Sequence, residues 1–144
     1  MEDKELLTYF FCACSNLRGA SRVITQAYDK VLEPSGLGIT QYGILVALEK
    51  AGSASINALG EFLVMDPTTL NRHLKPLLQK NLVQTRPGED HRVKLVSLTE
   101  QGQATLLAAS PLWAQAQSRI IEKMGRKRFE NFLNDLHFIE DLAQ

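Results

Sequence analysis

One segment constrains the fold of this chain more than any other: a predicted short helix that runs directly into a charged hairpin. The pair Asp66-Pro67 predicts a helix start, because aspartate can accept from the first free N–H groups and proline has no N–H to leave unpaired. The predicted helix ends near Lys80. Two β-prone stretches, residues 82–86 and 93–98, then flank a loop of turn formers and charged residues.

A second short helix is predicted just before this one, over residues 55–63, with Ser55 as its cap and Val64-Met65 as the break. Two short helices joined by a tight turn and followed by a hairpin form a winged helix-turn-helix. The sequence therefore predicts a mainly α fold with a small β-hairpin wing.

The predicted helix after Asp66 has an apolar side and a polar side. We expect Leu70, Leu74, Leu77 and Leu78 to be buried. The polar side chains are expected to face outward, and they are Thr68, Thr69, Asn71, Arg72, His73 and Lys75. Pro76 deletes one backbone hydrogen bond, so a bend is expected there.

Long helices are predicted at both ends of the chain. Residues 6–32 contain no proline and carry an apolar or small residue at alternating steps of four and three, at Phe10, Cys14, Leu17, Ser21, Ile24, Tyr28 and Val31. A further helix is expected over residues 40–49, then one over 99–124 with a kink at Pro111, and a last apolar-striped helix after Gly125. We assign residues 1–36 and 100–144 to a dimerisation region and residues 37–99 to a winged helix-turn-helix region, intertwined in one structural unit.

Composition agrees with one ordinary domain, since the 144 residues are 44% hydrophobic. The formal net charge is zero, yet six basic side chains face three acidic ones between Asp66 and Thr99. A local basic surface suits a protein that meets phosphate with one face, although such an excess is also common on a solvated face. The acidic start of the chain and the lack of a long apolar run predict a cytoplasmic protein without a membrane segment.

The polar face of the predicted helix suits double-stranded DNA. Asn71, Arg72 and His73 can read base edges in the major groove, while Thr68 and Thr69 can donate to phosphates. On the hairpin, Arg92 is placed to enter the minor groove, and Arg86 and Lys94 suit backbone contacts. The other residues expected at the DNA are Ser55, Lys75, Asp90 and His91. The competing interpretation is that the polar residues of the helix solvate a surface helix.

One helix-turn-helix makes too few contacts for tight specific binding, so such modules usually dimerise and read two half-sites about 34 Å apart. The apolar stripes at both chain ends can form the interface of a dimer. The run Arg126-Lys127-Arg128 is interpreted as a solvated helix face rather than a further DNA contact.

At this point the chain resembles the MarR family of transcription regulators. Leu37-Gly38-Ile39-Thr40-Gln41-Tyr42 is similar to the entry of the family's second helix, and residues 55–72 are similar to its helix-turn-helix, Ser55 included. The most specific match is Asp90-His91-Arg92 followed by Leu98-Thr99 and Gly102, which resembles the family's wing signature. Pro76 departs from the pattern.

The resemblance implies an obligate homodimer on a palindromic operator, usually a repressor. It implies that Asp90 and Arg92 support the wing and its minor-groove contact. It also implies release from DNA on binding a small, often phenolic, aromatic ligand or on thiol oxidation.

The two cysteines, Cys12 and Cys14, are too few for a disulfide framework or a zinc site. In one intact helix they would lie about 200° apart, so an internal disulfide is not expected. Cys14 resembles in position the reactive cysteine of the family's organic-hydroperoxide sensors, and Tyr28 resembles one of their tyrosines. Arg18 and Ile39 stand where those sensors have other tyrosines, so redox sensing, ligand sensing and plain packing of Cys14 remain alternatives.

Two other functions compete with DNA binding. A dimeric adaptor that keeps the winged fold without an operator would have a neutral helix and hairpin, whereas both are basic here. An enzyme finds no support, because His73, His91 and His137 have no metal-ligand spacing and no phosphate loop or nucleophile elbow occurs. We therefore expect no cofactor and no metal.

Overall fold

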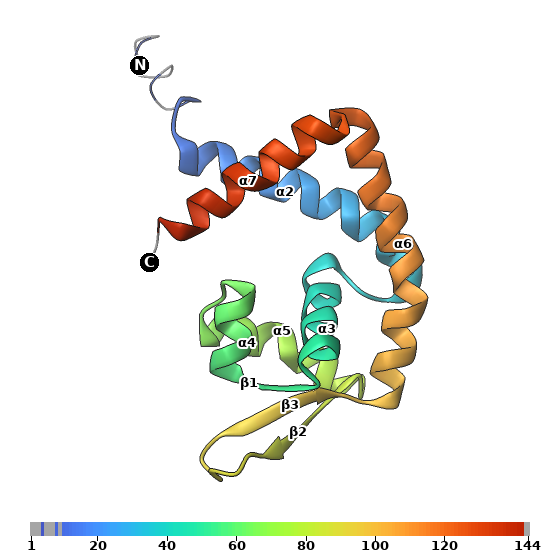
Figure 1. Cartoon of the computed structure of the whole chain (residues 1–144). Helices are drawn as coiled ribbons and strands as arrows, with labels where there is room; N and C mark the ends of the chain where they lie inside the picture. Colours follow the sequence, from blue (N-terminus) through green and yellow to red (C-terminus); the bar gives the residue numbers. More distant parts are fainter. Residues whose placement is uncertain (1–3, 5–7, 9, 143–144) are drawn as a thin grey trace.

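The computed structural model describes residues 4, 8 and 10–142. In chain order the elements are α2 (Ala13–Leu32), η1 (Glu33–Ser35), α3 (Ile39–Ala51), β1 (Ser53–Ser55), α4 (Ile56–Leu63), α5 (Pro67–Gln79), β2 (Val83–Pro87), β3 (Lys94–Leu98), α6 (Glu100–Met124) and α7 (Arg126–Asp141). Figure 1 shows two tiers: α3, α4, α5 and the sheet form the lower one, and α2 crosses α7 in the upper one. The long helix α6 runs along one side and joins the two tiers. This is the predicted mainly helical winged helix-turn-helix fold.

The sheet has three antiparallel strands in the order β1-β3-β2. In the hairpin, Val83 pairs with Leu98 and Pro87 with Lys94, close to the boundaries predicted from sequence. Strand β1, which pairs Ser53 with Ser97, was not predicted, because three small residues carry no strand pattern. Through β1, whose last residue Ser55 pairs with Leu95, the segment that leads into α4 is held against the middle strand of the sheet.

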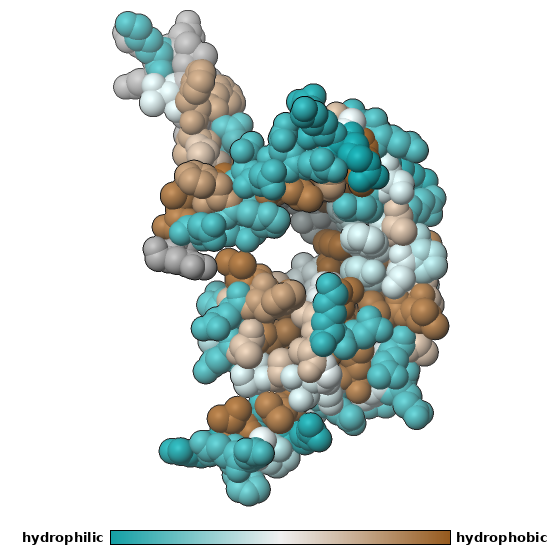
Figure 2. Space-filling view, in the orientation of Figure 1, coloured by the Kyte–Doolittle hydropathy of each residue, from teal (hydrophilic) through white to brown (hydrophobic). Residues whose placement is uncertain are grey.

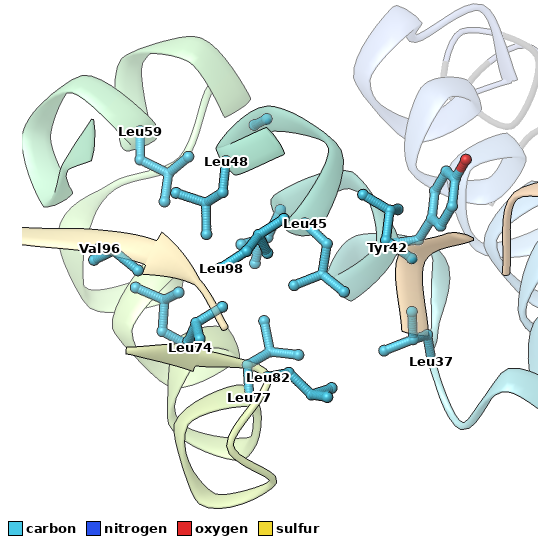
Figure 3. Close-up of a cluster of buried hydrophobic side chains, with 14 of the residues drawn as sticks. Leu37, Tyr42, Leu45, Leu48, Leu59, Leu74, Leu77, Leu82, Val96 and Leu98 are labelled. Carbon is cyan, nitrogen blue, oxygen red and sulfur yellow. The ribbon is translucent and has the colours of Figure 1, made fainter. Parts of the chain in front are cut away.

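The core of the lower tier surrounds α3 (Figure 3). Tyr42, Ile44, Leu45 and Leu48 of this helix are buried there. They pack with side chains of the other lower elements, among them Leu59, Leu70, Leu74, Leu77, Val83, Val96 and Leu98.

One predicted core residue of α5 is wrong. Leu78 is 42% exposed, whereas Leu70, Leu74 and Leu77 are buried. Residues three and four apart share a helix face, so these three residues face the core together, and Leu78 is turned about 100° from Leu77. Phe62 of α4 also lies outside the core, with 67% of its surface exposed.

The first predicted helix, over residues 6–32, is interrupted. Residue 11 is in a turn, Cys12 is extended (φ −71°, ψ 117°), and α2 begins at Ala13. The side-chain amide of Asn16 donates to the carbonyl oxygens of Phe10 and Cys12 at 2.6 and 2.9 Å. A side chain thus hydrogen-bonds to backbone carbonyls where the helix is interrupted. Residues 6, 7 and 9 of the predicted helix lie outside the described residues.

The interior prolines do not end their helices. Helix α5 continues through Pro76 to Gln79, and α6 continues through Pro111 to Met124. The backbone of Lys80 donates to the carbonyl of Pro76 at 3.0 Å, which closes the last turn of α5. The bends expected at the two prolines stay predictions.

A joint of hydrogen bonds connects the wing to α6. The hydroxyl of Thr99 donates to the carbonyl of Asn81 at 2.6 Å and accepts from the backbone N–H of Gly102 at 2.9 Å. The backbone N–H of Thr99 donates to the carbonyl of Leu82 at 3.1 Å. Gly102 lies so close to this carbonyl that a Cβ there would be 1.9 Å from the oxygen. The Leu98-Thr99 and Gly102 positions of the wing signature therefore form a close backbone contact.

A second joint connects α2 to α3. The carboxylate of Asp29 in α2 accepts from the backbone N–H of Ile39 at 2.7 Å, and thus caps the start of α3 from another helix. Gly38 leaves room for it, since a Cβ there would lie 3.2 Å from the Asp29 oxygen. The two joints thereby hold the lower tier to α6 and to α2.

The upper tier keeps apolar surface in the open. Phe129 is 9% exposed and anchors α7, but Phe138 and Leu142 at the far end of α7 are 66% and 68% exposed. On α2, Val23 and Ile24 are exposed as well. In Figure 2 brown, hydrophobic atoms appear along this tier.

No single helix in the described part of the chain is long and apolar enough to cross a membrane. Only α2 with η1 and α3 taken together pass such a test of length and composition, and this pair is bent by 71° at the break.

Candidate nucleic-acid interface

The start of α5 is fixed by the predicted cap. The carboxylate of Asp66 accepts from the backbone N–H of Thr69 at 2.9 Å and from its hydroxyl at 2.8 Å. These hydrogen bonds, the backbone one first, lower the pKa of Asp66. The hydroxyl proton of Thr69 is thus already used within the cap, and the side chain is half-buried rather than outward as expected.

The polar face of α5 is narrower than predicted. Thr68, Asn71, Arg72 and Lys75 are exposed, and their i, i+3, i+4, i+7 spacing places them on one face. The buried leucines Leu70, Leu74 and Leu77 lie on the other side of the helix. His73 is half-buried and lies beside this face rather than on it.

The turn between α4 and α5 depends on two residues that sequence reasoning missed. Val64 has φ 55°, the left-handed region that a β-branched residue rarely adopts. A Cβ on Gly60 would lie 2.7 Å from the carbonyl oxygen of Met65, so only glycine fits there without a shift. The glycine inside the predicted helix was the available signal. Ser55, predicted to contact DNA, is half-buried and accepts from the backbone N–H of Ala58 at 3.1 Å as the cap of α4.

The tip of the wing is organised by Asp90 and Arg92. The carboxylate accepts from the Arg92 backbone N–H at 3.1 Å and from its Nε and Nη2 at 3.2 and 3.1 Å. The Arg92 side chain and then its backbone lower the pKa of Asp90. Because the Arg92 side chain is still 90% exposed, its remaining donors are accessible at the tip.

The strands of the hairpin carry two more of the predicted cations. Arg86 is paired with Leu95 and Lys94 with Pro87, so they lie one register step apart at the distal end of the wing. Since successive residues of a strand point to opposite faces, Arg86 and Lys94 project from opposite faces of the hairpin. Both are exposed, as is His91 in the loop. Figure 2 shows this lower tip as hydrophilic.

The positive charge of this surface is largely uncompensated. Within the described residues of α5 and the wing, the only ion pair is that between Arg92 and Asp90. Arg72, Lys75, Arg86 and Lys94 are thus available to an external anion.

The two cysteines are exposed and unbridged. Cys12 precedes α2 in extended conformation, so the angle of about 200° expected for two cysteines of one intact helix does not apply to them. Cys14 is not packed as a core residue in the single chain. The side chain of Tyr28, half-buried on the same helix, donates to the Gln117 side-chain oxygen, and burial raises its pKa. The fourteen helical steps from Cys14 to Tyr28 span about 21 Å, so the two side chains are not neighbours within one chain.

In the part of the chain that the structure describes, no group of three or more His, Cys, Asp or Glu side chains could hold a metal ion.

Comparison with known proteins places the chain among regulators. The model of the MarR family matches residues 35–92. The chain is 33% identical over 84 residues to the uncharacterized HTH-type transcriptional regulator YwoH of Bacillus subtilis, covering 58% of this chain and 61% of that protein. It is 38% identical over 86 residues to the regulator SarZ of Staphylococcus aureus, covering 59% and 58%. The chain thus matches about three fifths of the length of these curated relatives.

Solved structures cover more of the chain. The M. tuberculosis transcriptional regulator MosR in complex with DNA is 32% identical with a TM-score of 0.81, over 92% of this chain and 98% of that one. A mutant of E. coli MarR complexed with operator DNA has a TM-score of 0.82, over 93% and 97%. At 20% identity the second supports the fold alone.

Proposed function

This chain belongs to the MarR family of winged-helix transcription regulators, and from that premise we propose that it binds a palindromic DNA operator as a homodimer. The observation that carries the proposal is the polar, basic face of α5 beside a wing with an exposed arginine tip. The similar MosR structure, which contains DNA, supports the same conclusion. No enzymatic activity is expected of such a regulator.

In the proposed complex α5 lies in the major groove. Asn71 and Arg72 have the side chains that pair with adenine and guanine edges. Thr68 and Lys75, at either end of the exposed face, contact phosphates. Thr69 acts through the cap of Asp66, and half-buried His73 and Ser55 hold the helices in place.

The wing lies over the minor groove. Arg92 enters it at the tip, held by Asp90, because a narrow minor groove attracts an arginine side chain. Arg86 and Lys94 contact the sugar-phosphate backbone from the two faces of the hairpin, with His91 in the loop between them.

Residues 1–36 and 100–144 form the dimerisation region in this proposal. The exposed apolar side chains of α2 and α7 support it, because a single chain in water rarely leaves so many in the open. The variant Phe138→Glu should dissociate the dimer in sedimentation experiments, whereas Glu140→Gln, a change at an exposed polar position of the same helix, should not. A variant that stays dimeric would remove the end of α7 from the interface.

In this proposal a chemical signal releases the protein from DNA, and two kinds of signal are compatible with the site. A small aromatic ligand is one. The other is oxidation of Cys14, in which a hydroperoxide converts the thiolate to a sulfenic acid and is itself reduced to an alcohol. Condensation of the sulfenic acid with a second thiol then releases water. The exposure of Cys14 and Cys12 supports this route, and a tyrosine such as Tyr28 can lie beside Cys14 only from a second chain.

The test is the affinity of the purified protein for DNA from its own upstream intergenic region. We expect tight binding that weakens with salt in proportion to the phosphates contacted. Arg72→Ala should abolish discrimination between this DNA and scrambled DNA, whereas Lys127→Ala should not. Binding that does not distinguish the two DNAs in the wild type would favour a dimeric adaptor that has lost its operator.

A further inference from the structure

The chain passes between the two tiers twice, once through α6 and once through the short connector 36–38 that joins η1 to α3 (Figure 1). Side chains from other elements hold both ends of this connector. The carboxylate of Asp29 accepts from the backbone N–H of Ile39, the residue just after it, at 2.7 Å. The ammonium group of Lys80 donates to the carbonyl oxygen of Gly36 at 3.3 Å. We call these two hydrogen bonds the connector clamp.

The two side chains of the connector clamp come from different parts of the molecule. Asp29 lies near the end of α2, in the upper tier. Lys80 is the C-terminal cap residue of α5, the helix proposed to enter the major groove. The connector clamp therefore links the end of α2 to the end of α5 through three residues of backbone.

The connector itself allows little adjustment. The N–H of Gly36 donates to the carbonyl of Glu33 at 3.0 Å, and the N–H of Gly38 donates to the side-chain oxygen of Gln41 at 3.2 Å. Leu37 between them is 3% exposed, and its N–H donates at 3.2 Å to the hydroxyl two residues before it. Because each backbone donor of the connector is already used, a shift of α3 and α5 relative to α2 must break hydrogen bonds.

The N–H of Ile39 depends on Asp29 for a partner. Ile39 is the first residue of α3, and the first N–H groups of a helix have no acceptor inside that helix. The residue at the N-cap is Gly38, which has no side chain that could supply an acceptor. The acceptor therefore comes from a different helix, and it is lost if the two helices move apart.

We propose that Asp29 and Lys80 are positioning residues that determine which spacing between the two halves of the operator the protein accepts. The inference rests on the proposed function. In a dimer joined through the upper tier, the separation of the two α5 helices depends on where each lower tier is held relative to its α2. The connector clamp fixes that position, so DNA with a different spacing requires the clamp to open. Neither side chain needs to touch DNA.

The experiment measures the affinity of the full-length protein for three DNAs by fluorescence anisotropy. One is the operator from the upstream intergenic region, and the others have one base pair inserted at or deleted from its centre. The wild type should bind the two altered DNAs at least about tenfold more weakly, because both hydrogen bonds of the clamp must break. Asp29→Ala should reduce this preference about fivefold, and Lys80→Met, which removes the longer hydrogen bond, about threefold.

Conservative variants separate positioning from stability. Asp29→Asn keeps an oxygen acceptor and Lys80→Arg keeps a donor, so both should retain most of the preference. Lys50→Met, at an exposed lysine of α3 outside the connector clamp, is the matched control and should change nothing. A variant that is only less stable would bind all three DNAs more weakly by the same factor, which leaves the preference unchanged.

Hydrogen exchange of the Ile39 amide tests the connector clamp in the free protein. Exchange should be slow in the wild type and in Asp29→Asn, and about fivefold faster or more in Asp29→Ala. Equal exchange in Asp29→Ala and the wild type would show that Asp29 does not hold this N–H in solution, and would overturn the proposal.

Three DNA-binding results would also overturn the proposal. They are equal binding of all three DNAs by a wild type that still rejects scrambled DNA, an unchanged preference in both Asp29→Ala and Lys80→Met, and the same loss in the conservative variants. A wild type that does not distinguish any of the three from scrambled DNA would instead refute the proposed function, and this inference with it. The scrambled DNA therefore tells the two failures apart.

Discussion

Gly102→Ala should destabilise the protein although alanine favours helices. Gly102 lies in the first turn of α6, where a Cβ would be 1.9 Å from the carbonyl oxygen of Leu82, against an ordinary contact of 3.4 Å or more. One backbone must therefore move by about 1.5 Å, the difference between these distances. Neither side can give easily, because both contacting groups belong to the main chain.

The magnitude follows from the hydrogen bonds at this joint. A shift breaks the Thr99 bonds to Leu82 and Asn81, at about 1 kcal/mol each, and weakens the Thr99 cap by about 1 kcal/mol. The intrinsic preference of helices for alanine returns about 1 kcal/mol. The net loss is about 2 kcal/mol, within the range of about 1–3 kcal/mol for overpacked sites.

The assay is thermal unfolding at one fixed protein concentration, since the stability of the proposed dimer depends on that concentration. For a chain of this size the loss corresponds to a fall in Tm of roughly 4–8 °C. Gly43→Ala is the matched control: it is also inside a helix, α3, but nothing lies within 4 Å of the added Cβ, so it should raise stability by up to about 1 kcal/mol. A Gly102→Ala protein as stable as wild type would refute the reasoning.

Four further outcomes are expected. Arg92→Ala should weaken operator binding by about 1–3 kcal/mol in a gel-shift titration while the dimer persists, and unchanged affinity would remove the wing tip from the mechanism. Val64→Asn should raise the free energy of unfolding by about 1 kcal/mol, because Val64 is 69% exposed and left-handed backbone costs valine more than asparagine. The reverse change at left-handed Asn81, Asn81→Val, should lower the free energy of unfolding. If both variants are as stable as the wild type, the strain argument is contradicted. Asp66→Asn retains a helix cap without its charge. Because the pKa of Asp66 is lowered in the folded protein, the wild type should be more stable than the variant at neutral pH, and this difference should vanish as pH falls below about 4 in urea unfolding. A difference that does not change with pH would exclude the carboxylate charge as its cause. Cys14→Ser should keep operator affinity under organic hydroperoxide that releases the wild type, and release of both proteins alike would exclude a Cys14 switch.

Features set by local chemistry could be predicted from the sequence. Asp66 and Pro67 start α5, Thr99 starts α6 and Gly125 ends it, because capping involves only neighbouring residues.

Features set by contact between distant segments could not be predicted. The close approach of Gly102 to Leu82, the pairing of Ser53 with Ser97 in β1 and the exposure of Leu78 depend on how the elements pack. In the candidate interface the sequence identified the exposed cations, but the use of the Thr69 hydroxyl within the cap required the structure.

Helix α6 has a mechanical consequence. Its 25 residues make one continuous rod of about 37 Å. The joint at Thr99 fixes one end of the rod to the wing, and the other end belongs to the upper tier. Swinging such a rod by about 5° moves its far end by roughly 3 Å, close to the 3.4 Å rise of one base pair. In the proposed dimer, a small tilt between the tiers would therefore move the two α5 helices out of register with their half-sites.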